Sequence, residues 1–224
     1  MWQGLARKRY QKRVQGTALA QCWSAAPKLN KTDWRDTTFL VADGEMSSLH
    51  VNDGELLSLG WVPLKEGRIV LSESRHILIN SDASVGDSAT IHQIRDCELS
   101  DGASAKMALD EFLRAAEGAV LVFHHALLDI AFLDKLSKQV YGAPLLLPVL
   151  DTLQIDLTRL KRRNETPEKG ALGLQGCRKR YSLPQYPAHN ALMDAVATAE
   201  LLLAQIKHRA HNKALPLSAL NKTS

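Results

Sequence analysis

The chain has 224 residues, of which 45% are hydrophobic, a size and composition that suit one α/β domain with an additional segment. Its three cysteines are widely spaced and form no Cys-x-x-Cys pair, which argues against a disulfide framework and a structural zinc site. No apolar run approaches the roughly 20 residues that span a bilayer, and a poor signal-peptide core follows the basic N-terminus. We therefore expect a soluble, cytoplasmic protein with no membrane contact.

The net charge of +4 is unevenly distributed, because seven basic residues and no acidic residue precede Asp33. The apolar residues among these bases follow helical spacing: Trp2, Leu5, Ala6, Tyr10 and Val14. This pattern predicts a basic amphipathic helix over residues 1 to about 30, and residues 1–36 are expected to be an extension and linker. Its apolar stripe could dock on the domain or on a protein partner such as a polymerase. Its basic face could contact nucleic acid.

Residues 39–45, Phe-Leu-Val-Ala-Asp-Gly-Glu, predict a short buried strand that ends in two acids. Side chains two positions apart on a strand share a face, so Asp43 and Glu45 are expected to project together. Two carboxylates at a buried strand end repel each other and lose hydration unless a cation compensates. Mg²⁺ and Mn²⁺ prefer such oxygen ligands, which indicates a metal site. A solvated strand end is the alternative.

Further along the chain, β-forming segments give way to helical ones. Residues 55–62 and 68–79 are rich in β-formers and flank Lys65-Glu-Gly67, which predicts an antiparallel hairpin. A long polar connection over residues 81–104 then leads to a helix over residues 106–117, with Ser104 as its cap.

The second half of the chain alternates strands and helices, which predicts a mixed sheet with helices on both faces. The predicted elements are a strand over 119–123, a helix opened by Asp129, a strand over 145–150, a helix over 151–162, a loop around a short segment over 164–186, and a helix that Asn190 caps and that runs to about Ala210. The main domain is expected over residues 37–210, followed by a frayed tail over residues 211–224.

Three further residues join the two strand acids as candidates for a site. Asp129 follows a buried strand, at the carboxyl end where α/β folds place their sites, although it could simply cap a helix. Asp194 lies in the first turn of the last helix, which a negative charge also stabilises through the helix dipole. His189 precedes that helix. Four acids at one sheet edge would accommodate two divalent ions, and a neutral imidazole could take a proton from water.

Three segments resemble the motifs of a known family. Val41-Ala-Asp-Gly-Glu-Met-Ser-Ser-Leu49, followed by Leu57-Ser-Leu-Gly60, resembles the first motif of the DnaQ-like, or DEDDh, 3′→5′ exonucleases. Val122-Phe-His-His-Ala-Leu-Leu-Asp-Ile-Ala-Phe-Leu133 is similar to the second motif, and His189-Asn-Ala-Leu-Met-Asp-Ala-Val-Ala-Thr-Ala-Glu200 to the third. The His-x4-Asp spacing is the most specific feature, because the sister group has Tyr-x3-Asp. The likeness leaves the N-terminal extension outside.

The resemblance implies a ribonuclease-H-like three-layer fold, with a central mixed sheet of about five strands flanked by helices. It implies that His189 is the general base and that four acids bind two Mg²⁺ or Mn²⁺ ions: Asp43, Glu45, Asp129 and Asp194. The implied reaction releases nucleoside 5′-monophosphates from the 3′ end of single-stranded nucleic acid, with DNA favoured, in proofreading during DNA replication or in DNA repair. An RNA-trimming exoribonuclease and a catalytically silent binding module are the alternatives.

The sequence departs from the family pattern at three positions that are expected to bind substrate. Gly44 replaces a bulkier residue, Met46 stands where Thr is common, and His125 replaces the usual Asn. A basic run before the third motif could contact the nucleic-acid backbone or be a solvated helix end: Arg159, Lys161, Arg162 and Arg163.

Overall fold

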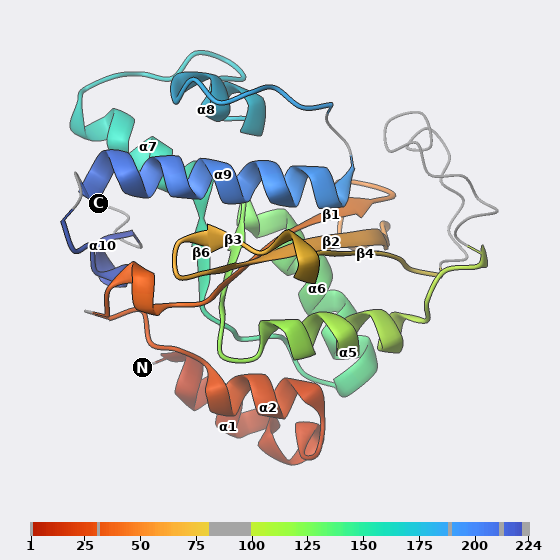
Figure 1. Cartoon of the computed structure of the whole chain (residues 1–224). Helices are drawn as coiled ribbons and strands as arrows, with labels where there is room; N and C mark the ends of the chain where they lie inside the picture. Colours follow the sequence, from red (N-terminus) through yellow and green to blue (C-terminus); the bar gives the residue numbers. More distant parts are fainter. Residues whose placement is uncertain (1, 31, 81–99, 188–189, 211–212, 221–224) are drawn as a thin grey trace.

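The computed structural model of the chain describes residues 2–30, 32–80, 100–187, 190–210 and 213–220 (Figure 1). Two of the features expected from the sequence, His189 and most of the polar connection over residues 81–104, lie outside these described residues. Within the described ranges, no helix is both long enough and apolar enough to cross a membrane.

A mixed sheet forms the centre of the molecule. Its strands are β1 (Phe39–Met46), β2 (Leu56–Lys65), β3 (Arg68–Ile69), β4 (Arg75–Leu78), β5 (Val120–Phe123) and β6 (Val149–Asp151). β2 runs antiparallel to β1, whereas β5 runs parallel to β1 and β6 parallel to β5. Because β3 and β4 both pair with β2, the sheet has five positions across, in the order β3/β4-β2-β1-β5-β6. The predicted mixed sheet of about five strands is confirmed.

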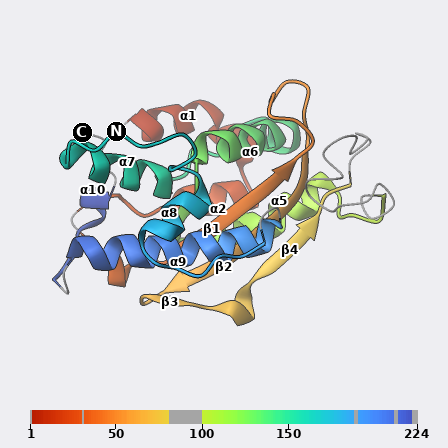
Figure 2. The ribbon, with the colours of Figure 1, turned by 90° about the horizontal axis from the view of Figure 1, so that it is seen from above.

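Two hydrophobic cores lie on opposite faces of this sheet, and alternate residues of β1 contribute to each. Leu40 and Ala42 pack toward α5 (Ala105–Ala116) and α6 (Ala126–Tyr141). Phe39 and Val41 pack toward α9 (Ala191–Ala210) on the other face. Figure 1 shows α9 and α5 on opposite sides of the strands, and Figure 2 shows α9 lying along the sheet from above. This is the predicted three-layer arrangement, with β1 buried in its middle.

Several elements begin or end differently from the prediction, and the differences are largest in the following three. The strand expected over residues 68–79 is interrupted between β3 and β4 by a 3-10 turn, η2 (Leu71–Glu73). The strand expected over residues 145–150 shortens to β6, because Leu146 has a φ of +48°, which a strand does not accommodate. α6 begins at Ala126 rather than at Asp129, which lies in its first turn. The remaining segments are α7 (Thr152–Arg162), α8 (Leu174–Arg180) and η1 (Trp34–Asp36).

The N-terminal segment forms two helices, α1 (Trp2–Val14) and α2 (Ala18–Ala25), so the prediction of one helix is wrong. The helices separate because the Thr17 hydroxyl accepts the amide of Ala20 and thereby caps a new helix. Val14 is buried in the core cluster that α5 and α6 share, whereas Leu5 of the same apolar stripe stays 69% exposed. Only part of that stripe is therefore used for docking on the domain.

Arg7, which was expected to face solvent or phosphate, turns inward. Its guanidinium donates to the carbonyl of Leu146 at 2.6 and 3.1 Å and to that of Trp23 at 3.0 Å. The Trp23 indole donates in turn to the carbonyl of Leu145 at 2.5 Å. These bonds fasten both N-terminal helices to the segment that precedes β6. The division of the chain at residue 36 stays a prediction.

The expectation of a frayed C-terminal tail is wrong for residues 213–220. They include the short helix α10 (Leu217–Leu220), and Leu215, Leu217 and Leu220 are buried in the core on the α9 side. The amide of Leu217 donates to the carbonyl of Thr32 at 3.0 Å. Apolar burial thus ties this segment to the residues that precede β1, which periodicity alone did not reveal because the segment is short.

Candidate functional site

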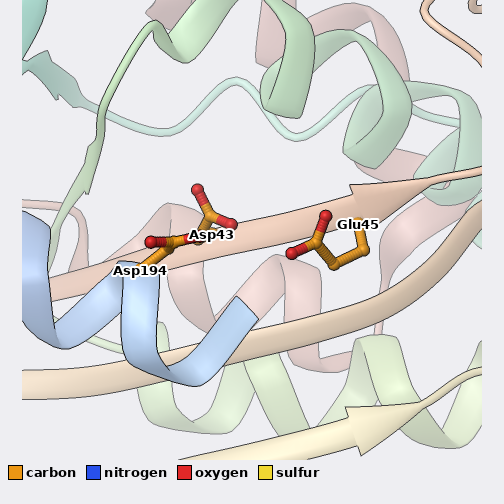
Figure 3. A group of neighbouring side chains, drawn as sticks. All are labelled: Asp43, Glu45 and Asp194. Atoms are coloured by element: carbon orange, nitrogen blue, oxygen red, sulfur yellow. The ribbon is translucent and has the colours of Figure 1, made fainter. Parts of the chain in front are cut away.

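Three carboxylates from two elements converge at the end of β1 (Figure 3). Asp43 and Glu45 leave β1 on the α9 side, and Asp194 comes from the first turn of α9. Each offers one carboxylate oxygen, and these oxygens all lie within 4.8 Å of one another. The expected common projection of Asp43 and Glu45 is therefore confirmed. We call these three residues the acidic cluster.

Asp129 lies next to the acidic cluster and is buried in the first turn of α6. Its Oδ1 accepts the backbone amide of Gly44 at 3.1 Å. Because Gly44 separates Asp43 from Glu45 in the chain, this bond ties the fourth predicted acid directly to the strand that carries the first two. Asp129 is therefore not a solvent-exposed helix cap, which is the alternative interpretation of this residue.

The start of α9 rests on β2, opposite Asp43. Asp43 pairs with Gly60 in the β1–β2 register. A Cβ atom at Gly60 would lie 2.6 Å from the carbonyl oxygen of Ala191 and closer still to the backbone of Leu192, so only glycine fits beneath the helix. Asn190 caps α9 as predicted, since its Oδ1 accepts the amide of Met193 at 3.1 Å. Gly60 thus sets how near Asp194 comes to β1.

Asp151, at the end of β6, orients the start of α6. Its carboxylate accepts the backbone amides of His125 at 3.0 Å and of Ala126 at 3.2 Å. His125 adopts a left-handed conformation there, with φ +67°. Sequence reasoning assigned no role to Asp151, although it bears the signal that identified Asp129, an acid at the carboxyl end of a parallel strand.

The crowding of carboxylates changes their proton affinity. Burial, followed by repulsion from Asp129, Asp194 and Glu45, raises the pKa of Asp43 well above its usual range. Burial raises the pKa of Asp129 to about 8, although the hydrogen bond from Gly44 acts in the opposite direction. A donor set made only of carboxylate oxygens, in which added negative charge is unfavourable, fits a hard divalent cation.

The positions of the predicted substrate-binding residues and of the basic run do not test their expected contacts with nucleic acid. Met46 is buried against the α5–α6 core, while His125 is exposed at the start of α6. Substrate contacts of Gly44, Met46 and His125 stay predictions. In the basic run, Arg163 forms an ion pair with Glu165 at 2.5 Å, and the Arg159 guanidinium lies 5.6 Å from the Tyr181 ring centroid.

The sequence matches an exonuclease family, RNase_T, over residues 40–202. The DNA polymerase III PolC-type protein of Thermotoga petrophila is 30% identical over 173 residues, which are 77% of this chain and 12% of that protein. The DNA polymerase III subunit epsilon-like protein of Rhodobacter capsulatus is 30% identical over 177 residues, which are 78% of this chain and 24% of that protein. The chain thus spans about a quarter or less of the length of these relatives.

Solved structures share the fold at lower identity. E. coli exonuclease I in complex with a dT13 oligonucleotide superposes with a TM-score of 0.64 at 15% identity, covering 78% of this chain and 42% of that chain. Exonuclease X in complex with 5′ overhanging duplex DNA gives a TM-score of 0.57 at 18% identity, covering 82% of this chain and 99% of that chain.

Substitution of Gly60 tests how the acidic cluster is assembled. Gly60→Ala should push the start of α9 away from β2 and weaken Mn²⁺ binding by about 10- to 100-fold, as loss of a metal-site support does. The measurement is the rise in melting temperature with increasing Mn²⁺. Gly4→Ala is the control, because a Cβ atom there meets nothing within 4 Å. An unchanged Mn²⁺ response in Gly60→Ala would contradict this assembly.

The raised pKa of Asp129 predicts how pH affects the metal-free protein. Between about pH 4 and pH 8, the folded carboxyl keeps a proton that the unfolded carboxyl has lost. The folded state binds more protons, so this group makes the free energy of unfolding fall as pH rises through that window. Thermal melts in EDTA should show a shallower fall for Asp129→Asn than for the wild type. Parallel curves would rule out a raised pKa.

Proposed function

Because the chain belongs to the RNase T exonuclease family, we propose that it is a metal-dependent 3′→5′ exonuclease acting on single-stranded nucleic acid. The observation that carries this proposal is the meeting of three carboxylates within 4.8 Å at the end of the buried central strand. Asp129, bonded to Gly44 beside them, completes the four acids that the family resemblance implies.

In the proposed site, two Mg²⁺ or Mn²⁺ ions would be held by four carboxylates: Asp43, Glu45, Asp129 and Asp194. Ions bound there would supply Lewis acidity and stabilise negative charge on the attacking and leaving oxygens of a phosphodiester. The protein contributes rigidity, because β1 stays paired with β2 through both of its acids and α9 is seated on Gly60. Carboxylates held in this way need little rearrangement when cations bind.

We assign the general base to His189, on the resemblance of its segment to the third family motif. It directly precedes Asn190, whose side chain caps the helix that carries Asp194. In the proposed reaction, His189 takes a proton from water as the water oxygen bonds to the terminal phosphorus. The bond from phosphorus to the 3′ oxygen of the preceding nucleotide breaks, that oxygen takes a proton from solvent to become the new 3′ hydroxyl, and a nucleoside 5′-monophosphate leaves.

Single-stranded DNA is the favoured substrate. The two relatives named above are DNA polymerase III proteins, and the fold is shared with an exonuclease I structure that contains a dT13 oligonucleotide. These likenesses support a role in proofreading or repair, with a polymerase as a partner. RNA trimming is the second candidate within the class. A catalytically silent module is disfavoured, because all four acids and His189 are present.

A direct assay tests the proposed reaction. Single-stranded DNA and RNA of matched sequence, labelled at the 5′ end, should be incubated separately with Mg²⁺ or Mn²⁺. The wild type should shorten the DNA from its 3′ end and release nucleoside 5′-monophosphates. Asp43→Asn should abolish turnover while leaving the circular dichroism spectrum intact, because it removes a metal ligand and not a packing contact. Turnover that persists in EDTA or in Asp43→Asn would refute metal-dependent catalysis, and faster turnover of RNA would select the second candidate.

If His189 is the general base, its substitution should lower the rate of hydrolysis without weakening metal binding. His189→Ala should lower kcat by about 10²–10⁴ at neutral pH, whereas its melting temperature should still rise with Mn²⁺ as in the wild type. The fall in rate on the acid side of the pH profile should also disappear. His208→Ala, at the other end of α9, is the control. Equal rates and pH profiles for His189→Ala and the wild type would show that another group is the base.

A further inference from the structure

The loop over residues 47–54, which we call the β1–β2 loop, begins two positions after Glu45, so its first residues lie beside that member of the acidic cluster. Its two ends are closed onto each other: the amide of Ser47 donates to the carbonyl of Glu55 at 3.0 Å, and the amide of Glu55 donates to Ser47 Oγ at 2.9 Å. Between them the loop presents Leu49 to solvent, 78% exposed. A segment that borders a site and projects outward is placed to meet a ligand.

Lys135, in the middle of α6, binds the far side of this loop. Its ammonium nitrogen lies 2.9 Å from the carbonyl oxygen of Val51, 3.2 Å from that of Asn52 and 2.8 Å from that of Gly54. An ammonium group has three N–H donors, so these three carbonyls use its whole donor capacity. Hydrogen bonds to a charged donor are stronger than those between neutral groups. This arrangement differs from that of an ordinary surface lysine, whose ammonium is solvated.

The loop also lies directly on α6. A Cβ atom at Gly54 would come within 3.0 Å of the Phe132 ring, so the backbone there has no space to move toward the helix. α6 carries both Asp129 and Lys135, which are six residues and therefore about 9 Å apart along its axis. One rigid helix thus holds a carboxylate of the proposed site at its start and the bordering loop at its centre.

We propose that Lys135 is a positioning residue for substrate, whose ammonium clamps the β1–β2 loop to α6 and so presents residues 47–50 to the terminal nucleotides of the strand. The inference rests on the proposed function, since it assumes that a nucleic-acid 3′ end enters beside the acidic cluster. Without the hydrogen bonds of Lys135, the loop would become ordered only when substrate binds. The conformational entropy lost in ordering it would weaken substrate binding. Chemistry at the carboxylates would be unaffected, because they do not depend on Lys135.

Lys135→Met tests this role, because it keeps the length and apolar character of the side chain and removes the three donors. KM for a single-stranded oligonucleotide should rise about tenfold, which corresponds to about 1.4 kcal/mol, while kcat and the Mn²⁺-dependent rise in melting temperature stay at wild-type values. Hydrogen–deuterium exchange of the amides of residues 47–54 should accelerate. Lys135→Arg, which keeps the charge and can reach part of the carbonyl set, should recover part of the KM.

Lys138→Met is the matched control, since Lys138 is an exposed lysine one turn further along the same helix. The KM of Lys138→Met and the hydrogen–deuterium exchange of its β1–β2 loop should equal those of the wild type. The proposal is overturned if exchange of the loop is unchanged in Lys135→Met, or if exchange accelerates while KM does not move. It is also overturned if kcat and the Mn²⁺ response fall together with KM, because α6 as a whole would then have shifted. A wild type that cleaves no nucleic acid would refute the proposed function, and the exchange experiment would still show whether Lys135 clamps the loop.

Discussion

Repulsion between carboxylates that the fold holds together is the constraint on which the site depends. Asp43, Glu45 and Asp194 place oxygens within 4.8 Å of one another, where Glu45 and Asp194 are buried and Asp43 is half-buried. Burial first, and repulsion from neighbouring carboxylates second, raise the pKa values of Asp43 and Asp129, so each keeps its proton where an exposed carboxyl would have lost it. Packing elsewhere must offset this unfavourable free energy. A bound divalent cation would remove it, because each carboxylate would then be attracted to the cation.

Contacts of the backbone hold in place the strand and helices that carry the acids. β1 pairs with β2 from Phe39 to Met46 and with β5 from Phe39 to Val41. The absence of a side chain at Gly60 lets α9 sit on β2, and the carboxylate of Asp151 caps the start of α6. Contacts close to each acid therefore hold the element that carries it: β2 beside β1, Gly44 bonded to the first turn of α6, and Gly60 beneath α9. Lys135 holds the loop beside the site in a similar way, because its ammonium donates hydrogen bonds to three backbone carbonyls of that loop.

Patterns local in the chain were sufficient to predict the sheet, the central strand and the acids, because alternation and strand-end position are properties of neighbouring residues. Contacts between distant segments were not predictable in this way. Nothing in the spacing of α1 indicates that Arg7 binds the carbonyl of Leu146, or that Lys135 binds a loop more than 80 residues away. Local patterns predict a tail for the short apolar segment around Leu217, because its backbone partner Thr32 lies near the other end of the chain.

Titration of the metal-free protein with Mn²⁺ measures whether the clustered carboxylates give up protons to bind cations, with heat and proton release measured together in buffers of different ionisation enthalpy. We expect about two ions per chain and a net release of protons near neutral pH, because carboxylates with raised pKa values must ionise to bind. Asp43→Ala should bind fewer ions and release fewer protons. Binding without proton release, or a titration that is identical in Asp43→Ala, would contradict the account.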